Sequence, residues 1–308
     1  WAGQRARTEE VGEPVARGVV SASAPRPVLA TIRDALETVV TVDSASARVM
    51  EGSLALDGAG GLGIEPSRVP VSALSRGHAI EIPVRLKVPA EPGCYRAGLA
   101  LKLRTMAAQS SFSVLRLGAE GGVTISEEVR EGHAVRVIDN GRCTLVVAPE
   151  YGPSLISWTQ AGEEQLHSSF PTPSGHAWAY PWYGGIQLKV FLNDDAESCG
   201  NLVHERFTVE DLYSDVDGLP WAGVRLRGRP ERKELHDLAV EMDYVTLPRS
   251  PLIKAVLRLT NLRPTRQDVM IGGGADFSLG GDPARLSLVG DDVWRRPTPW
   301  GAWYAGRT

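Results

Sequence analysis

The sequence predicts an all-β protein built from two β-sandwiches, and three observations lead to this fold class. Apolar residues recur at every second position in several short runs, which is the period of a half-buried strand. The chain has 33 glycines and 21 prolines, 54 of its 308 residues, so turns are frequent. No long amphipathic helix is found, and a stretch such as Ser126–Arg130 predicts only a helical turn or two. A length of 308 residues is typical of two domains.

Charge and composition exclude several classes of protein. The chain has 33 Lys and Arg against 37 Asp and Glu, a net charge of −4, which gives no general attraction to nucleic acid or to an anionic membrane. No run approaches the roughly 18 apolar residues of a membrane span. The three cysteines exclude a disulfide scaffold and a Cys₄ metal site, although Cys143 and Cys199 could pair. We expect no cofactor and no metal.

Residues 1–16 are polar, and we interpret them as a linker. Gly12 and Pro14 lie close together in this stretch, which favours a loop. The chain begins at Trp1 rather than at Met, so we expect a piece of a longer polypeptide or a processed form. Further domains of the same polypeptide are therefore expected partners.

Residues 17–120 alternate apolar and polar positions with a turn about every ten residues, which is typical of a sandwich. The predicted strands are 78–88, 97–103 and 111–115, and Pro89, Pro92 and Gly93 separate the first two. Cys94 is expected to be a small buried hydrophobe. The segment IEIPVRLKVPAEPGCYRAGLALKLRT (80–105) resembles the Ig-like modules that accompany many bacterial glycosidases. The segment has no cluster of polar residues, so we expect a spacer without a ligand site. The pairing of this module with the second part of the chain favours an exported protein.

Residues 121–308 begin with the strongest hairpin signal of the chain. Asp139, Asn140 and Gly141 join two alternating runs, and Asn-Gly is the preferred pair of a tight hairpin turn. The predicted strands of this part are 134–138, 143–147, 152–158, 221–227, 238–245 and 253–261.

Four segments of this second part, in this order, carry a resemblance. They are the stretch 140–158, Tyr183-Gly184-Gly185-Ile186-Gln187, His204-Glu205-Arg206-Phe207, and 242–262 leading into Gly274-Ala275-Asp276-Phe277. Together they resemble the aldose 1-epimerase (galactose mutarotase) superfamily. The resemblance implies a sugar-binding β-supersandwich that extends from 121 to 308.

The resemblance also implies three catalytic roles: a carboxylate base, a histidine that protonates the ring oxygen, and a second histidine that holds the sugar. His204 matches the first histidine, and Asp276 occupies the position of the second. No Glu follows Glu241, so the base has no counterpart. An ionised carboxylate accepts hydrogen bonds but does not donate a proton, so Asp276 suits binding better than acid catalysis. A turn role for Asp276 after three glycines stays open.

Aromatic residues gather in a Pro- and Gly-rich stretch that is typical of a loop. Trp178 and Trp182 lie four residues apart there, and indole rings stack on the C–H face of a pyranose. Packing in a wide core is the alternative interpretation. His167 and His176 have no further ligand at a zinc spacing, so zinc is not expected.

We conclude from the sequence that the second part is a carbohydrate-binding, non-catalytic domain of a larger carbohydrate-active protein. Two alternatives stay open: an aldose 1-epimerase-like isomerase, or two spacer modules of a larger glycosidase or transferase. In the isomerase, His204 would be catalytic, and the base would be Asp282, Asp291 or Asp292 or would lie in a part of the polypeptide outside this sequence. The predicted carbohydrate site comprises Trp178, Trp182, His204, Arg206 and Asp276.

Overall fold

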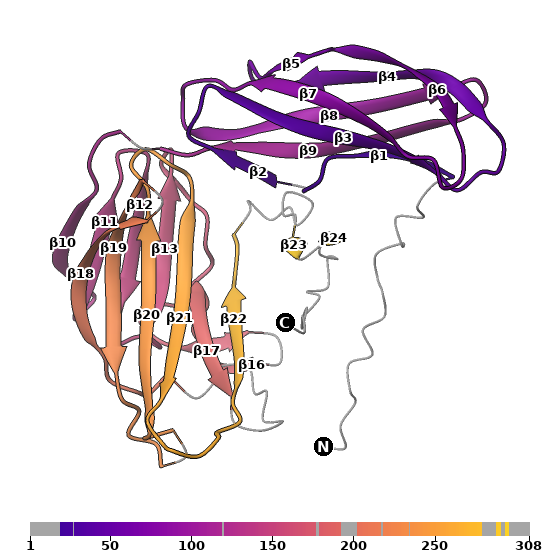
Figure 1. Cartoon of the computed structure of the whole chain (residues 1–308). Helices are drawn as coiled ribbons and strands as arrows, with labels where there is room; N and C mark the ends of the chain where they lie inside the picture. Colours follow the sequence, from indigo (N-terminus) through magenta and orange to yellow (C-terminus); the bar gives the residue numbers. More distant parts are fainter. Residues whose placement is uncertain are drawn as a thin grey trace. The chain divides into compact units, whose positions relative to one another are not determined.

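The computed structural model describes residues 19–278 except 27, 119, 177–178, 192–201, 217 and 234, and also residues 288–290 and 293–295. The predicted linker 1–16 lies outside these residues. The described part consists of strands joined by turns and loops, without a helix, which confirms the all-β prediction (Figure 1). Within it, we find no helix of the length and apolarity needed to cross a membrane.

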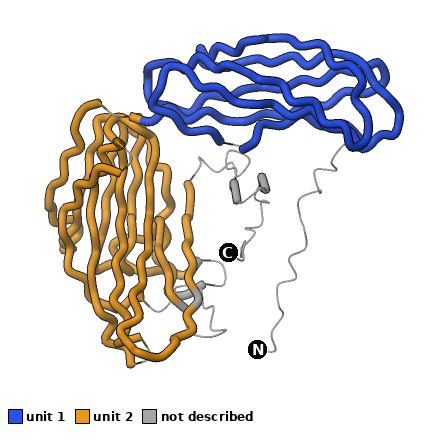
Figure 2. The backbone as a smooth tube through the Cα atoms, viewed as in Figure 1, with its two compact units in different colours: residues 1–117, 282–308 blue, residues 118–281 orange. Residues whose placement is uncertain are grey.

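The chain divides into two compact units (Figure 2). Unit 1 comprises residues 1–117 with 282–308, and unit 2 comprises residues 118–281. A short two-stranded ribbon, β23 (Leu288–Gly290) with β24 (Val293–Arg295), belongs to the last part of the sequence.

Unit 1 contains two sheets. The four-stranded sheet has the order β1-β3-β7-β5, and the five-stranded sheet has the order β2-β9-β8-β4-β6, in which β2 runs parallel to β9. The strands are β1 (Val20–Ser23), β2 (Val28–Thr31), β3 (Ala35–Ser44), β4 (Met50–Gly58), β5 (Gly63–Glu65), β6 (Arg68–Leu74), β7 (Ile80–Lys87), β8 (Gly93–Leu103) and β9 (Ala107–Arg116).

The core of unit 1 lies between its two sheets because the strands alternate. In β7 the residues Ile82, Val84 and Leu86 are buried, while the intervening residues face solvent. The prediction that Cys94 is buried is wrong, since its side chain is exposed. In β8 the buried face carries Leu99 and Leu101, and Cys94 lies on the opposite face by the same alternation.

Unit 2 also contains two principal sheets, which lie face to face (Figure 1). The larger sheet has the order β10-β11-β12-β13-β17-β22, with β14 beside β13, and the smaller sheet has the order β18-β19-β20-β21. Their strands are β10 (Thr124–Arg130), β11 (His133–Asp139), β12 (Cys143–Ala148), β13 (Ser154–Gln160), β14 (Glu163–Glu164), β17 (Ile186–Phe191), β22 (Met270–Ala275), β18 (Thr208–Val216), β19 (Leu219–Gly228), β20 (Leu238–Thr246) and β21 (Ile253–Asn261). A separate ribbon pairs β15 (Ser174–His176) with β16 (Ala179–Trp182).

The helical turn predicted at 126–130 is wrong, because these residues belong to β10. All seven residues of β10 pair with β11. The side chains of Glu127 and Arg136 face each other across this pairing, with 2.6 Å between Oε2 and Nη1. Cross-strand pairing therefore overrides the local preference of a charged, helix-forming segment.

The predicted Asn-Gly hairpin is confirmed, and its asparagine also joins the two sheets of unit 2. Asn140 is fully buried, and Gly141 has φ +80°. The Asn140 Nδ2 atom lies 2.8 Å from Thr246 Oγ1, 3.0 Å from the Leu247 carbonyl and 2.7 Å from the Ser250 carbonyl. Its Oδ1 accepts hydrogen bonds from the backbone N–H groups of Arg142 and Cys143, at 2.9 and 2.8 Å.

Two further buried polar groups of unit 2, a thiol and a phenol, each donate a hydrogen bond to a backbone carbonyl. The Cys143 thiol donates to the Ser250 carbonyl at 3.2 Å, and burial raises its pKa. Cys199, the partner that the sequence suggested, lies outside the described residues. The Tyr244 hydroxyl donates to the Pro153 carbonyl at 3.0 Å, and burial raises the pKa of this phenol, so it stays a donor.

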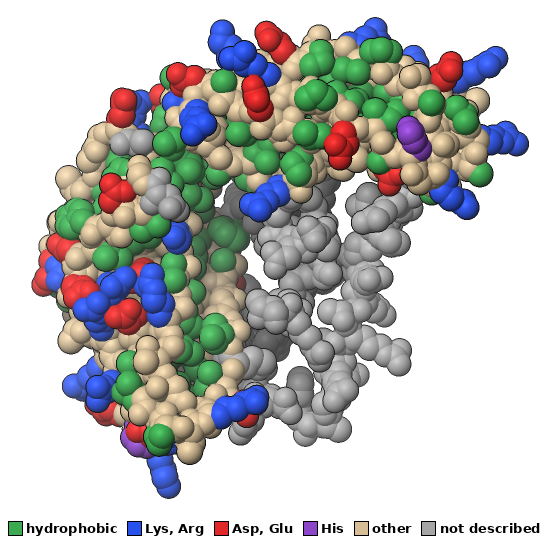
Figure 3. Space-filling model, in the orientation of Figure 1, with side chains coloured by type: hydrophobic (Ala, Val, Ile, Leu, Met, Phe, Trp, Pro, Cys, Tyr) green, Lys and Arg blue, Asp and Glu red, His purple; other side chains and the backbone are tan. Residues whose placement is uncertain are grey.

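The outer face of the smaller sheet carries a network of alternating charges (Figure 3). Asp243 accepts two hydrogen bonds from Arg225, at 2.6 and 2.9 Å, and another from Arg258. Its side chain is only 3% exposed. Burial alone would raise the pKa of Asp243, but the hydrogen bonds and positive charges of the two arginines outweigh burial and lower it.

Acid is expected to remove the stabilising contribution of Asp243. A carboxylate with a lowered folded-state pKa stabilises fully above its unfolded pKa, and this contribution is lost as the pH falls through the folded-state value. We expect D243N to be less stable than the wild type by a constant amount between pH 7 and 5. The difference in urea midpoint should shrink below about pH 4.

The control for this prediction is D268N, because the Arg266–Asp268 pair is exposed, with 2.7 Å between its charged atoms. Exposed pairs contribute little, so D268N should match the wild type at every pH. Two results would contradict the prediction: a difference in urea midpoint between D243N and the wild type that is unchanged at pH 2.5, or no difference between them at pH 7.

Candidate functional site

The predicted site residues fall in three segments of unit 2. Trp182 is the last residue of β16 and is half-buried, and Asp276 directly follows β22 and is also half-buried. His204 and Arg206 are exposed in the turn segment that precedes β18. Trp178 lies outside the described residues.

A three-way backbone junction holds the Asp276 region together. The His167 N–H donates to the Asp276 carbonyl at 2.8 Å, and the Gly185 N–H donates to the His167 carbonyl at 2.8 Å. The Asp276 N–H donates to the Gly185 carbonyl at 2.9 Å and closes the triangle. Three segments that are distant in sequence therefore meet at one point.

Two glycines make this close approach possible. Gly184 and Gly185 have φ of +70° and +72°, a conformation that other residues rarely adopt. A Cβ atom on Gly184 would lie 2.3 Å from the His167 carbonyl oxygen, and one on Gly185 would lie 2.3 Å from the Leu155 carbonyl oxygen. The Gly-Gly pair that the sequence singled out is thus required by backbone packing.

Alternation places His167 and Asp276 on one face of this junction. Leu166 and Phe277 form an isolated bridge, and both pack against the core between the sheets. Their neighbours His167 and Asp276 are directly opposite each other in that register, and so point to the other face. The His167 ring also meets the Trp182 ring edge to face, with centroids 4.7 Å apart. An imidazole, a carboxylate and an indole are thereby brought together.

On the same side of the larger sheet, β17 carries polar residues and β22 carries glycines. In β17, Ile186, Leu188 and Val190 pack towards the core, so Gln187 and Lys189 point the other way. Gln187 and Lys189 are 6% and 8% exposed. Across from them, β22 presents Gly274 opposite Gln187 and Gly272 opposite Lys189.

A second small core lies on the outer side of the larger sheet and supports the Trp182 segment. The rings of Tyr151, Phe170 and Tyr183 meet edge to face, with centroids 5.2 Å apart for Tyr151–Phe170 and 4.9 Å for Tyr151–Tyr183. The Ser169 hydroxyl lies 2.8 Å from the Tyr151 hydroxyl and 2.7 Å from the Trp182 carbonyl. These contacts fix the backbone of Trp182 and Tyr183.

His204 and Arg206 lie on a separate turn. Val203, the neighbour of His204, packs against the Tyr151–Phe170–Tyr183 cluster, which links this turn indirectly to the Trp182 segment. Between His204 and Arg206, the carboxylate of Glu205 accepts the backbone N–H of Glu231 at 2.6 Å. The described contacts thus bring Trp182 and Asp276 together through His167. His204 and Arg206 lie on a neighbouring loop.

From the sequence we did not predict His167, Gln187 or Lys189 as site residues. His167 was considered only as a zinc ligand, and its neighbours in space are far away in sequence. Ile186–Phe191 alternates apolar and polar residues, which indicates a strand, but such a pattern normally places the polar residues in solvent. Within the described residues, no group of three or more His, Cys, Asp or Glu side chains could hold a metal ion.

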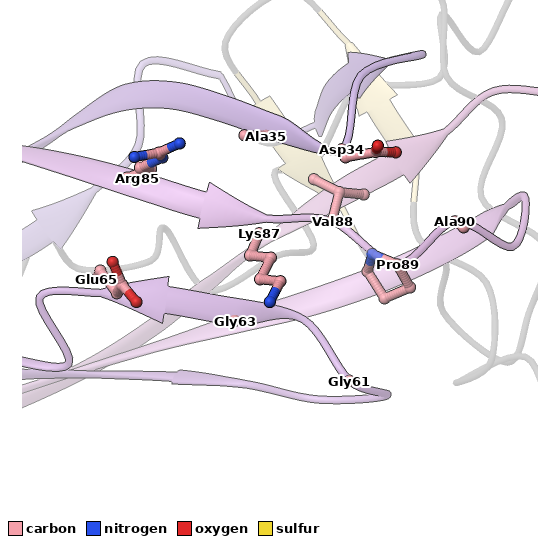
Figure 4. Close-up of a pocket in the computed structure, with 10 residues that line it drawn as sticks. All are labelled: Asp34, Ala35, Gly61, Gly63, Glu65, Arg85, Lys87, Val88, Pro89 and Ala90. Atoms are coloured by element: carbon pink, nitrogen blue, oxygen red, sulfur yellow. The ribbon is translucent and has the colours of Figure 1, made fainter.

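Unit 1 contains a separate polar groove on the outer face of its four-stranded sheet (Figure 4). Its volume is about 760 Å³. Lys87 and Arg85 from β7 line it together with Glu65 and Asp34, and the small residues around Gly63 leave the space open. Its lining has no aromatic side chain, so it lacks the stacking surface that a sugar ring prefers.

No family model matches this sequence, and no curated protein matches it. Among solved structures, the chain is similar to the periplasmic chaperone SfaE, with 12% identity, 46% of this chain and 98% of that chain covered, and a TM-score of 0.24. It is also similar to the secreted serine protease VesC from Vibrio cholerae, with 10% identity, 84% of this chain and 47% of that chain covered, and a TM-score of 0.27. At these TM-scores neither likeness bears on fold or function.

Proposed function

We propose that unit 2 is a mutarotase-like carbohydrate-binding domain and that it binds a saccharide on the face that carries His167, Trp182 and Asp276. The observation that carries this proposal is the backbone junction that sets these three side chains beside one another. An indole offers a stacking surface to the C–H face of a sugar ring, while a carboxylate and an imidazole exchange hydrogen bonds with its hydroxyls.

The arrangement suits binding more than catalysis. Asp276 is a strong acceptor as a carboxylate, and the proton-removing Glu of the resembled superfamily has no counterpart in this sequence. In this proposal His204 and Arg206 extend the site from their neighbouring loop. Unit 1 then serves as a spacer, and both units belong to a larger carbohydrate-active polypeptide.

One observation favours an isomerase as the second candidate function. His167 and Asp276 are cross-strand neighbours, so an imidazole and a carboxylate share one face, as acid–base catalysis requires. The three other acids that the sequence offers as bases, Asp282, Asp291 and Asp292, lie outside the described residues. Polarimetry of freshly dissolved α-D-galactose distinguishes the two functions. Mutarotation that the wild-type protein accelerates, and that neither H167A nor D276N accelerates, would favour the isomerase over a binding domain.

The W182A variant is expected to bind saccharides at least about tenfold more weakly than the wild type, because the stacking surface is lost. The measurement is isothermal titration of both proteins against a panel of neutral and acidic mono- and oligosaccharides. The control is Y213A, which removes an exposed aromatic ring from β18, away from the junction. Equal affinities for the wild type and W182A, or no heat with any saccharide, would contradict the proposal.

A further inference from the structure

The polar groove of unit 1 surrounds Lys87, a lysine without an opposite charge in its own row of the sheet. Lys87 is exposed on the outer face of β7, since its neighbours Leu86 and Val88 are buried in the core. The register places Ala35 of β3 beside it on one side and Gly63 of β5 on the other. Neither residue has a polar side chain, so among the described strands this row of the sheet carries only the ammonium charge.

Small residues keep the space around this ammonium group open. A Cβ atom on Gly63 would lie 3.1 Å from the Lys87 Cβ atom and 3.9 Å from its Cδ atom, so the stem of the lysine lies across β5 (Figure 4). At one end of the groove, a Cβ atom on Gly61 would lie 3.7 Å from the Pro89 Cγ atom, so the turn meets the proline there. The volume of about 760 Å³ is in the range of small-molecule sites, about 300–1,000 Å³.

The carboxylates that line the groove do not neutralise Lys87. Asp34 accepts a hydrogen bond from Arg116, with 2.9 Å between Oδ1 and Nη2, so it already has a cation. Glu65 lies one row away, directly opposite Arg85. Among the described residues, no ion pair joins Lys87, Arg85 or Glu65 to a partner. The lining charges that remain are two cations and one carboxylate, which favours an anionic ligand.

Two arginines of unit 2 show the usual arrangement of a cation on an outer sheet face. Arg225 lies opposite Asp243, and Arg227 lies opposite Glu241. Both pairs are in contact, at 2.6 and 2.8 Å. Opposite charges directly across a strand pair stabilise a sheet. At Lys87 the groove lies where such a carboxylate would stand, so an anion that enters the groove completes the row.

We propose that this groove binds a small organic anion, a carboxylate or a phosphate ester with an aliphatic body, and that Lys87 donates hydrogen bonds to the anionic group. A lysine ammonium has three donors, and hydrogen bonds between charged groups are stronger than those between neutral groups. The lining near Lys87 includes Ala35, Pro89 and Ala90, which offer aliphatic contacts to the body of the ligand. The ligand gives unit 1 a function besides that of a spacer, and the proposal does not depend on saccharide binding by unit 2.

The test is an NMR titration of the isotope-labelled full chain with succinate, glutarate and glycerol 1-phosphate at low ionic strength. We expect saturable chemical-shift changes at the backbone N–H groups of Gly61, Gly63 and Lys87 with at least one of these anions. Inorganic phosphate should bind at least about tenfold more weakly than the best organic anion, because it makes no contact with the aliphatic lining.

Three variants locate the anionic group. K87M should bind the best organic anion at least about tenfold more weakly than the wild type, and K87R should keep most of the affinity. A35E leaves the lysine in place but sets a carboxylate directly opposite it, so the anion should bind at least about fivefold more weakly. The matched control is K102M, which removes an exposed lysine of β8 and changes the net charge by the same amount. Its affinity should equal that of the wild type.

No saturable change at Gly63 and Lys87 with any of the three organic anions would overturn the proposal, and so would equal affinities for K87M and K102M. If K87M does not fold, wild-type affinity in A35E overturns it instead. Inorganic phosphate that binds as tightly as the organic anions would overturn the assignment of an organic ligand. Each of these results leaves saccharide binding by unit 2 untouched, so the two proposals fail separately.

Discussion

Substituting Asn140 with alanine is expected to lower the free energy of unfolding of unit 2 by about 3 kcal/mol or more. The asparagine side chain contacts three acceptors at the end of β20 and in the turn that follows it, at Thr246, Leu247 and Ser250, and it also accepts the N–H groups of its own hairpin turn. Each buried polar group that loses its partner costs about 1–3 kcal/mol, and alanine replaces none of these bonds. Urea unfolding followed by tryptophan fluorescence measures the loss.

The matched control is N261A. Asn261 is exposed at the end of β21, and its side chain bonds only within its own turn, to Thr265 and Arg263. Water replaces these bonds when the side chain is removed, so we expect a change of less than about 1 kcal/mol. If N140A and N261A lose similar stability, Asn140 does not join the two sheets in the way that the structure indicates.

Substituting Gly185 with alanine should destabilise unit 2 by about 3 kcal/mol and disrupt the proposed site at the same time. A left-handed backbone costs a residue with a Cβ about 1–2 kcal/mol. The added Cβ would also lie 2.3 Å from the Leu155 carbonyl oxygen, so the backbone must move. Because Gly185 bonds to both His167 and Asp276, that movement separates the side chains on the binding face.

G162A isolates the cost of the backbone conformation alone. Gly162 has φ +81°, and among the described glycines it is one where a Cβ atom would meet nothing within 4 Å. We expect G162A to lose only about 1 kcal/mol, and to bind saccharides as the wild type does. Equal losses for G185A and G162A would show that the junction tolerates a larger residue, against the packing described here.

Strand positions were predictable from the sequence wherever one face of the strand is buried. The nine-residue strand predicted at 253–261 is β21 with the same bounds, and the Asn-Gly hairpin forms as expected. Local patterns determine both elements. The alternation of apolar and polar residues determines the strand, and a glycine with a left-handed backbone determines the hairpin turn. The prediction for Ser126–Arg130 is wrong because its residues are charged on both faces, so only the pairing with β11 reveals the strand.

The site was predictable only in part. Trp182 was predicted from the aromatic content of its segment, and Asp276 was predicted from the family resemblance. In the structure the two are joined through His167, which neither observation indicated. His167 meets Gly185 and Asp276 through backbone hydrogen bonds, whose partners no local pattern specifies. Lys189 was missed because a lysine in an alternating strand is normally solvated. Its burial depends on which loops cover that face.

The most direct test of saccharide recognition is an NMR titration of the isotope-labelled wild-type chain with the saccharide that gives the largest heat in the titration panel. We predict chemical-shift changes at the Trp182 indole N–H, the His167 ring and the backbone of Gly185 and Asp276. Changes confined to the polar groove around Lys87 in unit 1, or no changes with any saccharide of the panel, would contradict the account.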